Sequence, residues 1–172
     1  PASRPGPRPG SRHSPLNFPP PASHTAVIPL SFNHRPVLLS QVVEHLQVLP
    51  GRRYLDGTLG GGGHAAAVLA AGGDVVGIDR DPNALAAASA HITAQGTLER
   101  FTPIRGRFAD MADLAGHLAP FHGILLDLGV SSPQLDTPDR GFSLKHDGPV
   151  DMRMDPDQPL DAAGLLDSLD EA

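Results

Sequence analysis

Short apolar runs alternate with helical patterns over most of the chain. Apolar residues recur at helical spacing from Leu39 to Leu49, which predicts an amphipathic helix over residues 38–48 that ends at Pro50-Gly51. Continuous apolar runs predict four short strands, at Tyr54–Asp56, Val75–Ile78, Phe101–Ile104 and Gly123–Asp127. Between these strands, helices are expected over about residues 64–71, 82–94 and 109–118.

Strands that alternate with helices, each strand a continuous apolar run, are typical of a parallel sheet covered on both faces. We therefore predict an α/β fold with a doubly wound parallel sheet, in which Pro103 assigns the third strand to an edge. Four strands form only a partial sheet of this class, and the fourth would be an exposed apolar edge. We expect the chain to be C-terminally incomplete. Past Asp127 the strand signals stop, and a helix is expected to begin at Asp161.

The pattern divides the chain into three parts. Residues 1–33 are rich in Pro, Ser and Arg without periodicity, which predicts a disordered tail. This tail is either a start-site extension or solubilising tail, or a basic arm that contacts RNA phosphates. Residues 34–135 hold the strand and helix pattern and form the predicted cofactor-binding half-domain. Residues 136–172 are expected to form a lid loop and the start of a helical region.

Composition narrows the class of protein. A chain of 172 residues has room for one domain of ordinary size. It contains no cysteine, which excludes disulfides and thiolate metal sites. No apolar run approaches the roughly 20 residues that span a bilayer. With no secretory apolar segment in the sequence, we expect a soluble, cytoplasmic protein without a membrane partner.

Charge is distributed unevenly along the chain. The formal net charge is −6, but 4 of the 13 basic residues lie in residues 1–43, where there is no acid. The rest of the chain therefore carries 9 basic against 19 acidic side chains. This balance is a poor electrostatic footprint for naked nucleic acid. If the substrate is RNA, its affinity must come from shape, from a larger particle or from sequence beyond these residues.

Four consecutive glycines, Gly60 to Gly63, follow the first strand and precede a helix expected from His64. A strand, a glycine turn and a helix N-terminus form a cradle for a nucleotide-type ligand, because the bare backbone lets a ligand approach closely. Asp56 ends the strand, where its charge disfavours a pyrophosphate and attracts a cation. S-adenosylmethionine carries a sulfonium and an ammonium and no phosphate. The glycines alone also fit a dinucleotide pattern.

Two positions further along the chain suit a nucleoside ligand. Asp79 closes the second strand 19 residues after Gly60, where an acid can receive both ribose hydroxyls; otherwise it is a solvated strand-end residue. Phe108 lies just past the third strand and either faces adenine or packs in the core. We interpret Arg80 and Asp81 as surface residues that cap the following helix.

The loop after the fourth strand offers polar groups to a ligand. The stretch Asp127–Gln134 contains a carboxylate, two hydroxyls and an amide at a strand end, where ligands of open α/β sheets bind. Alternatively, Ser131 and Ser132 only cap a turn. The acidic stretch 147–157 lacks the alternate spacing of a calcium loop, so we predict no metal site. We expect an ordered lid that carries Arg153 toward a substrate phosphate or a neighbouring acid.

Six blocks over roughly residues 34–172 together resemble the bacterial small-subunit ribosomal RNA (cytosine-N4)-methyltransferase family. The blocks are His34-x-Pro36-Val37-Leu38-Leu39, Asp56-Gly57-Thr58-x-Gly60-Gly61-Gly62-Gly63-His64, Gly77-Ile78-Asp79-Arg80-Asp81-Pro82, Asp127-Leu128-Gly129-Val130-Ser131-Ser132-Pro133-Gln134-Leu135-Asp136, Arg140-Gly141-Phe142-Ser143 and Gly148-Pro149-x-Asp151-Met152-Arg153-Met154-Asp155. The resemblance implies a Rossmann-like class I fold that uses S-adenosylmethionine. The implied reaction methylates the N4 amine of a cytidine in the decoding region of 16S ribosomal RNA, within the small ribosomal subunit. Residues 136–172 would then lead into an inserted helical domain.

The same resemblance implies the residues of the cofactor site. These are Gly62, Gly63, His64, Asp79, Phe108, Asp127 and Gln134. The first three would contact the methionine part, Asp79 the ribose and Phe108 the adenine side, and the last two would complete the pocket. The catalytic proton acceptor stays unassigned, with Asp127 as the best candidate.

Two other functions stay open. A nicotinamide-dependent oxidoreductase fits the glycine loop, although Asp56 argues against its pyrophosphate. Alternatively, the chain is a degenerate fragment that binds the cofactor or the ribosome without turnover. The pattern does not determine the oligomeric state, and self-association stays open.

Overall fold

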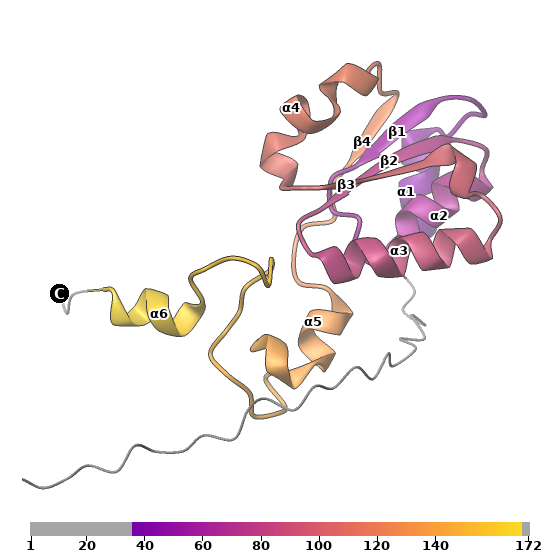
Figure 1. Ribbon diagram of the computed structural model, residues 1–172. Helices are drawn as coiled ribbons and strands as arrows, with labels where there is room; N and C mark the ends of the chain where they lie inside the picture. Colours follow the sequence, from indigo (N-terminus) through magenta and orange to yellow (C-terminus); the bar gives the residue numbers. More distant parts are fainter. Residues whose placement is uncertain (1–35, 170–172) are drawn as a thin grey trace, which may run out of the picture.

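The computed structural model describes residues 36–169, and its elements alternate as the sequence pattern predicts (Figure 1). In chain order the helices and strands are α1 Leu39–Leu46, β1 Arg53–Asp56, α2 Gly63–Ala70, β2 Asp74–Asp79, α3 Pro82–Ala94, β3 Phe101–Arg105, α4 Met111–Ala115, β4 Gly123–Leu125, α5 Ser132–Asp136 and α6 Ala162–Asp167. Short 3-10 turns lie between them: η1 Leu98–Arg100, η2 Phe108–Asp110, η3 Gly116–Leu118 and η4 Pro138–Arg140. The tail predicted at residues 1–33 lies outside the described residues.

The four strands form one parallel sheet in the order β3-β2-β1-β4. This order is the first part of the doubly wound pattern, in which the chain starts at the centre, builds outward to one edge and then returns to the other side. The predicted parallel sheet is therefore confirmed, and so is the edge position of the strand that contains Pro103. The point where the winding reverses lies between β1 and β4. Ligands of this fold bind there, at the carboxyl ends of the strands.

Helices cover both faces of the sheet, as predicted (Figure 1). Successive residues of a strand point to opposite faces, so Tyr54 packs under α1, α2 and α3 while Leu55 packs under α4. On the first face, Leu69 and Ile92 are fully buried. Burial of each such side chain stabilises the fold by about 1.5–3 kcal/mol.

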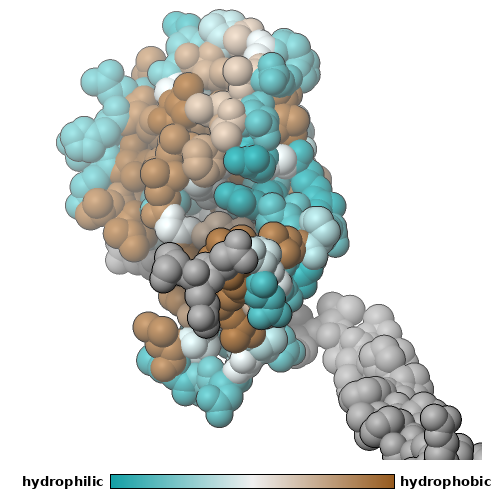
Figure 2. Space-filling model, turned by 90° about the vertical axis from the view of Figure 1, so that its left-hand side faces the viewer, coloured by the Kyte–Doolittle hydropathy of each residue, from teal (hydrophilic) through white to brown (hydrophobic). Residues whose placement is uncertain are grey.

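The β4 edge is apolar and exposed, as the sequence pattern predicts. Ile124 in the middle of β4 is 54% exposed, and Leu126 and Leu128 beyond it are exposed as well. Figure 2 views the molecule from the left-hand side of Figure 1 and shows apolar side chains gathered on this side. β4 is also shorter than predicted: it ends at Leu125, because its partner β1 ends at Asp56, directly opposite.

Two further predictions about helices need correction. The helix predicted over residues 109–118 is broken into η2, α4 and η3. Gly116 lies at the end of α4, and glycine is a poor helix former. The sequence pattern also missed α5, although Pro133 in its first turn is a helix start signal.

The chain past β4 forms α5, η4 and α6 away from the sheet (Figure 1). The helix expected from Asp161 is confirmed, because the Asp161 carboxylate accepts a hydrogen bond from the Gly164 N–H at 2.8 Å and so caps α6. The domain boundary predicted between residues 135 and 136 stays a prediction. Within residues 36–169, no helix has the length and apolar character needed to cross a membrane.

Candidate functional site

A cavity of about 660 Å³ lies at the carboxyl ends of the strands, between the glycine loop and the loop after β4. Its size is typical of a small-molecule site. Six of the seven predicted cofactor residues line it: Gly63, His64, Asp79, Phe108, Asp127 and Gln134. Residues that the sequence reasoning did not assign to the site also line it, among them Pro36, His91 and Met154. The topology therefore brings together side chains from most of the described chain at one point.

Gly62, the seventh predicted residue, is absent from the cavity wall that the described residues form. It is the N-cap of α2 and has a φ of 76°, which favours glycine. A Cβ at this position would lie 2.9 Å from the Cβ of Ala88 in α3. Gly62 therefore allows α2 and α3 to pack closely behind the loop, and this packing accounts for the glycine without a ligand.

The Asp79 carboxylate is fixed by two backbone amides. Its Oδ2 accepts a hydrogen bond from the Gly60 N–H at 2.8 Å, and its Oδ1 accepts one from the Asp81 N–H at 2.9 Å. Each oxygen keeps a further lone pair for another donor. Asp79 thus ties the glycine loop to the end of β2, and it faces the cavity as an oriented acceptor.

Asp81 corrects the prediction of a surface residue. It caps α3, as expected, because its Oδ1 accepts a hydrogen bond from the Asn83 N–H at 2.9 Å. However, it is only 4% exposed, and its Oδ2 lies 2.6 Å from Nη1 of Arg140. A buried carboxylate needs a partner of this kind, because an unpaired charge is costly in the protein interior.

The side chains of His64 and Asp127 lie next to each other on the cavity wall. Nε2 of His64 lies 3.5 Å from Oδ2 of Asp127, and the His64 Nδ1 is buried without a hydrogen-bond partner within the described part of the chain. The Asp127 side chain is 53% exposed, while its N–H donates to the Thr58 Oγ1 at 2.7 Å. Asp127 is therefore anchored through its backbone, and its carboxylate is accessible to a ligand.

Asp56 does not act as the sequence analysis expected. Asp56 is 3% exposed and does not line the main cavity. Its Oδ1 accepts a hydrogen bond from the Thr58 N–H at 3.1 Å. Its Oδ2 has no hydrogen-bond partner among residues 36–169. Burial, together with the smaller effect of the charges of Asp79 and Asp127, raises the pKa of Asp56 to about 7. Asp56 therefore carries only part of a negative charge at neutral pH. The attraction for a cation comes instead from the carboxylates on the wall.

Phe108 and Gln134 both lie on the cavity wall. Phe108 begins η2 and is half-buried beside Gly57, and its contact with adenine stays a prediction. Gln134 is buried on the wall, and its Oε1 accepts a hydrogen bond from the Ser131 N–H at 2.8 Å. The capped turn after β4 therefore exists, and it is part of the site.

The acidic stretch 147–157 is held by arginines. Arg153 binds the neighbouring acid Asp151, with Nη2 and Oδ2 2.6 Å apart, and this pairing holds the pKa of Asp151 at about 2. The expectation that Arg153 meets a neighbouring acid is confirmed. In the described residues, no group of three or more potential metal ligands comes together.

The residue that sequence reasoning missed is Arg140. Besides Asp81, it binds the backbone oxygens of Arg153 and Met154 through Nη2, at 3.0 and 3.3 Å. It was visible only as part of a sequence block without a role, because no periodicity links residue 140 to residues 81 and 154.

Comparisons with known proteins agree with this architecture. Residues 31–172 match the model of the MraW methylase family. The chain is 54% identical over 140 residues to ribosomal RNA small subunit methyltransferase H of Myxococcus xanthus, an alignment that covers 81% of this chain and 45% of that protein. It is 51% identical to the protein of the same name from Trichlorobacter lovleyi, with 78% and 44% covered. The chain thus spans about half the length of the curated relatives it matches. By the extent of these matches, the chain belongs to the MraW methylase family.

Proposed function

We propose that this chain forms the cofactor-binding part of an S-adenosylmethionine-dependent methyltransferase that acts on the N4 amine of a cytidine in the decoding region of 16S ribosomal RNA. The observation that carries this proposal is the cavity at the reversal point of the sheet, whose wall bears the carboxylates of Asp79, Asp81 and Asp127. The relatives' names, ribosomal RNA small subunit methyltransferase H, support the substrate class. A cytoplasmic location and the option of self-association stay predictions.

The charge of the cavity wall fits S-adenosylmethionine better than a dinucleotide. Of the described residues, three carboxylates and one arginine, Arg80, line the cavity. Asp81 is paired with Arg140, so the negative charge that a ligand meets comes from Asp79 and Asp127; it favours the ammonium and sulfonium of S-adenosylmethionine and opposes a pyrophosphate. Gly60, Gly61 and Gly63 line the cavity and let a ligand approach the backbone closely.

Four residues of the wall are assigned roles in holding the cofactor. The fixed carboxylate of Asp79 accepts the ribose hydroxyls, and Phe108 offers an apolar surface to the adenine. Asp127 and His64 lie at the other end, beside the loop after β4, where the amino acid part is expected. When bound, the cofactor supplies a methyl group on a sulfonium, which is open to in-line displacement.

The acceptor chemistry requires a hydrogen-bond acceptor next to the nucleophile. The lone pair of the cytosine N4 is delocalised into the ring, and an acceptor that binds the N4–H localises it and takes the proton. We assign this role to the Asp127 carboxylate, which is half exposed at the carboxyl end of β4 and anchored through its N–H. Holding donor and acceptor in line contributes the larger part of the rate, with effective molarities of about 10⁵ to 10⁸ M.

Calorimetric titration tests the cofactor first. The chain is expected to bind S-adenosylmethionine and not NAD, and a clear preference for NAD would overturn the proposal. Incubation of small ribosomal subunits with a labelled methyl donor then tests turnover. Binding without transfer of label would favour the alternative of a chain that binds the cofactor but does not catalyse.

A further inference from the structure

Arg140 connects the end of β2 with the segment of residues 151–157, which are far apart in the sequence. Nη1 of its guanidinium lies 2.6 Å from the Asp81 Oδ2, and Nη2 donates to the carbonyls of Arg153 and Met154. The Arg140 side chain is 18% exposed and that of Asp81 is 6% exposed, so this is a largely buried contact. Such a charge pair is screened much less than a surface pair.

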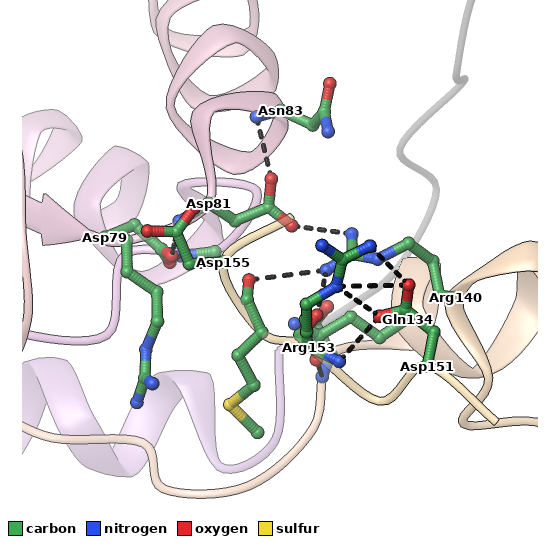
Figure 3. Close-up of polar contacts among 12 residues, drawn as sticks. Asp79, Asp81, Asn83, Gln134, Arg140, Asp151, Arg153 and Asp155 are labelled. Carbon is green, nitrogen blue, oxygen red and sulfur yellow. Dashed lines mark hydrogen bonds and ion pairs between the residues drawn. The ribbon is translucent and has the colours of Figure 1, made fainter. Parts of the chain in front are cut away.

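On the side of the sheet, Arg140 reaches the cavity through a chain of hydrogen bonds. Asp81 gives its N–H to Asp79, which in turn holds the N–H of Gly60. Asp81 also caps α3 through Asn83. Figure 3 shows Asp81 in this central position, between Asp79 and Arg140. Asp79 and Asp81 therefore form one turn. The carboxylate of Asp81 is paired with Arg140, so the position of the Asp79 carboxylate depends on this pair.

On the other side, the backbone around Arg140 packs tightly against the segment. The Arg140 carbonyl accepts a hydrogen bond from the Met152 N–H at 3.1 Å. Gly141 has a φ of 74°, and a Cβ there would lie 2.5 Å from the carbonyl oxygen of Pro149. Met154 also lines the cavity, and Arg140 binds its carbonyl as well as the carboxylate of Asp81. The segment therefore forms part of the wall beside Asp79, and Arg140 holds it there.

We propose that Arg140 is a positioning residue for the nucleoside end of the cofactor site. It orients the Asp79–Asp81 turn and holds residues 152–154 against the cavity, so that the ribose-binding carboxylate and the wall beside it are set by one guanidinium. Arginine suits this task because its planar fork directs separate N–H groups at a carboxylate and at two carbonyls, which the single ammonium of lysine cannot match. This inference rests on the proposed function.

The test compares ligands that share the nucleoside end and differ at the other. S-adenosylhomocysteine contains both ends, and 5′-methylthioadenosine lacks the amino acid part. The variant R140Q is expected to weaken binding of both ligands by the same factor, about tenfold or more, as measured by calorimetry. D127N, at the opposite end of the cavity, is expected to weaken S-adenosylhomocysteine more than 5′-methylthioadenosine. R105Q, a change in an exposed arginine that binds Asp155 and Asp157, is the matched control and should change either affinity by less than about twofold.

Two more variants separate positioning from a general loss of structure. D81N keeps a side chain that caps α3 but removes the charge, and D81N/R140Q is expected to bind ligand no more weakly than the worse single variant. R140K keeps a positive charge beside Asp81 and is expected to fold, while hydrogen exchange of the amides of residues 152–154 becomes faster and exchange in β1 and β2 does not change. Faster exchange in β1 and β2 would indicate a general loss of structure. Faster exchange confined to residues 152–154 would indicate that Arg140 positions this segment.

The outcomes distinguish the two proposals. If the unchanged chain binds S-adenosylhomocysteine, and R140Q and R140K bind both ligands as tightly as it does, the positioning role of Arg140 is wrong and the proposed function stands. If R140Q does not fold, R140K tests the positioning role instead, through its affinity for the two ligands and through amide exchange of residues 152–154. If the unchanged chain binds neither ligand, the proposed function fails and this inference fails with it.

Discussion

The sheet domain and the segment that follows it are held by different kinds of contact. In residues 53–123 the buried side chains are mostly apolar and form a cluster on each face of the sheet. In residues 136–169, large apolar side chains such as Leu144 and Leu166 are exposed, and arginines bind carboxylates and carbonyls instead. Apolar burial places the sheet, whereas a few charged hydrogen bonds place the segment that completes the cavity wall.

The two parts of the cavity wall are therefore stabilised by different kinds of interaction. The acid on β2 and the glycine loop belong to the sheet, where non-directional apolar packing makes the backbone rigid. The part of the wall that contains Met154 depends on directional contacts that a single substitution removes. We therefore expect the two regions to respond differently to mutations, pH and salt.

The largest effect is expected in the core beneath α3. Ile92 is fully buried, and the change to Ala is expected to lower the free energy of unfolding by about 2–5 kcal/mol, because it removes apolar contacts and leaves a cavity. Denaturant unfolding followed by circular dichroism measures the change. The matched control is Leu166→Ala in the exposed part of α6, with an expected change within about 0.5 kcal/mol. Equal losses for the two variants would contradict the comparison between the regions.

The next effect concerns ligand binding at the end of β2. Asp79→Ala removes the acceptor of two backbone N–H groups and of the expected ribose hydroxyls, so affinity for S-adenosylhomocysteine should fall about 100-fold, given about 1.5–3 kcal/mol for each hydrogen bond to a charged group. Asp74→Ala, at the other end of the same strand, is the control and should retain the affinity. Calorimetry decides between them, and an unchanged affinity in the Asp79 variant would remove the basis of the proposed site.

The sheet was open to prediction from sequence because its signals are local. Continuous apolar runs and turn residues indicated all four strands, and Pro103 indicated an edge. The glycine loop and Asp79 were recognisable because they follow strand ends at a regular spacing. Parallel strands bring such positions together whatever the details of packing.

The remaining features depend on contacts between distant residues. The burial of Asp81 follows from Arg140, 59 residues later, and no local pattern encodes that pair. Asp56 was interpreted as a charge that attracts a cationic ligand, but it is buried and its pKa is raised, so it carries only part of that charge. The role of Gly62 in helix packing required knowledge of where α3 lies.

The pKa of Asp56 predicts a pH dependence of stability. In the native state its pKa is raised from 3.8 to about 7, so between these values the folded chain holds a proton that the unfolded chain has released. The free energy of unfolding therefore falls as pH rises through this window, by up to about 1.4 kcal/mol per pH unit. Asp56→Asn is expected to reduce this slope, measured as denaturant midpoints from pH 4 to pH 8. The exposed Asp113→Asn should retain it, and identical slopes for both variants would contradict the burial of this charge.

The smallest effect is expected at the exposed contact between the two regions. Nη2 of Arg105, at the end of β3, lies 2.9 Å from the Asp155 Oδ1 and 2.5 Å from the Asp157 Oδ2, and the arginine is well exposed. Arg105→Gln should leave the unfolding midpoint unchanged, because exposed pairs contribute little, but it should speed amide exchange near Asp157. In about 1 M salt the unchanged chain should come to resemble this variant, since the Debye length there is about 3 Å. The largely buried Arg140 pair should resist the same salt, and equal sensitivity of the two contacts would mean that the segment is held at its surface and not at Arg140.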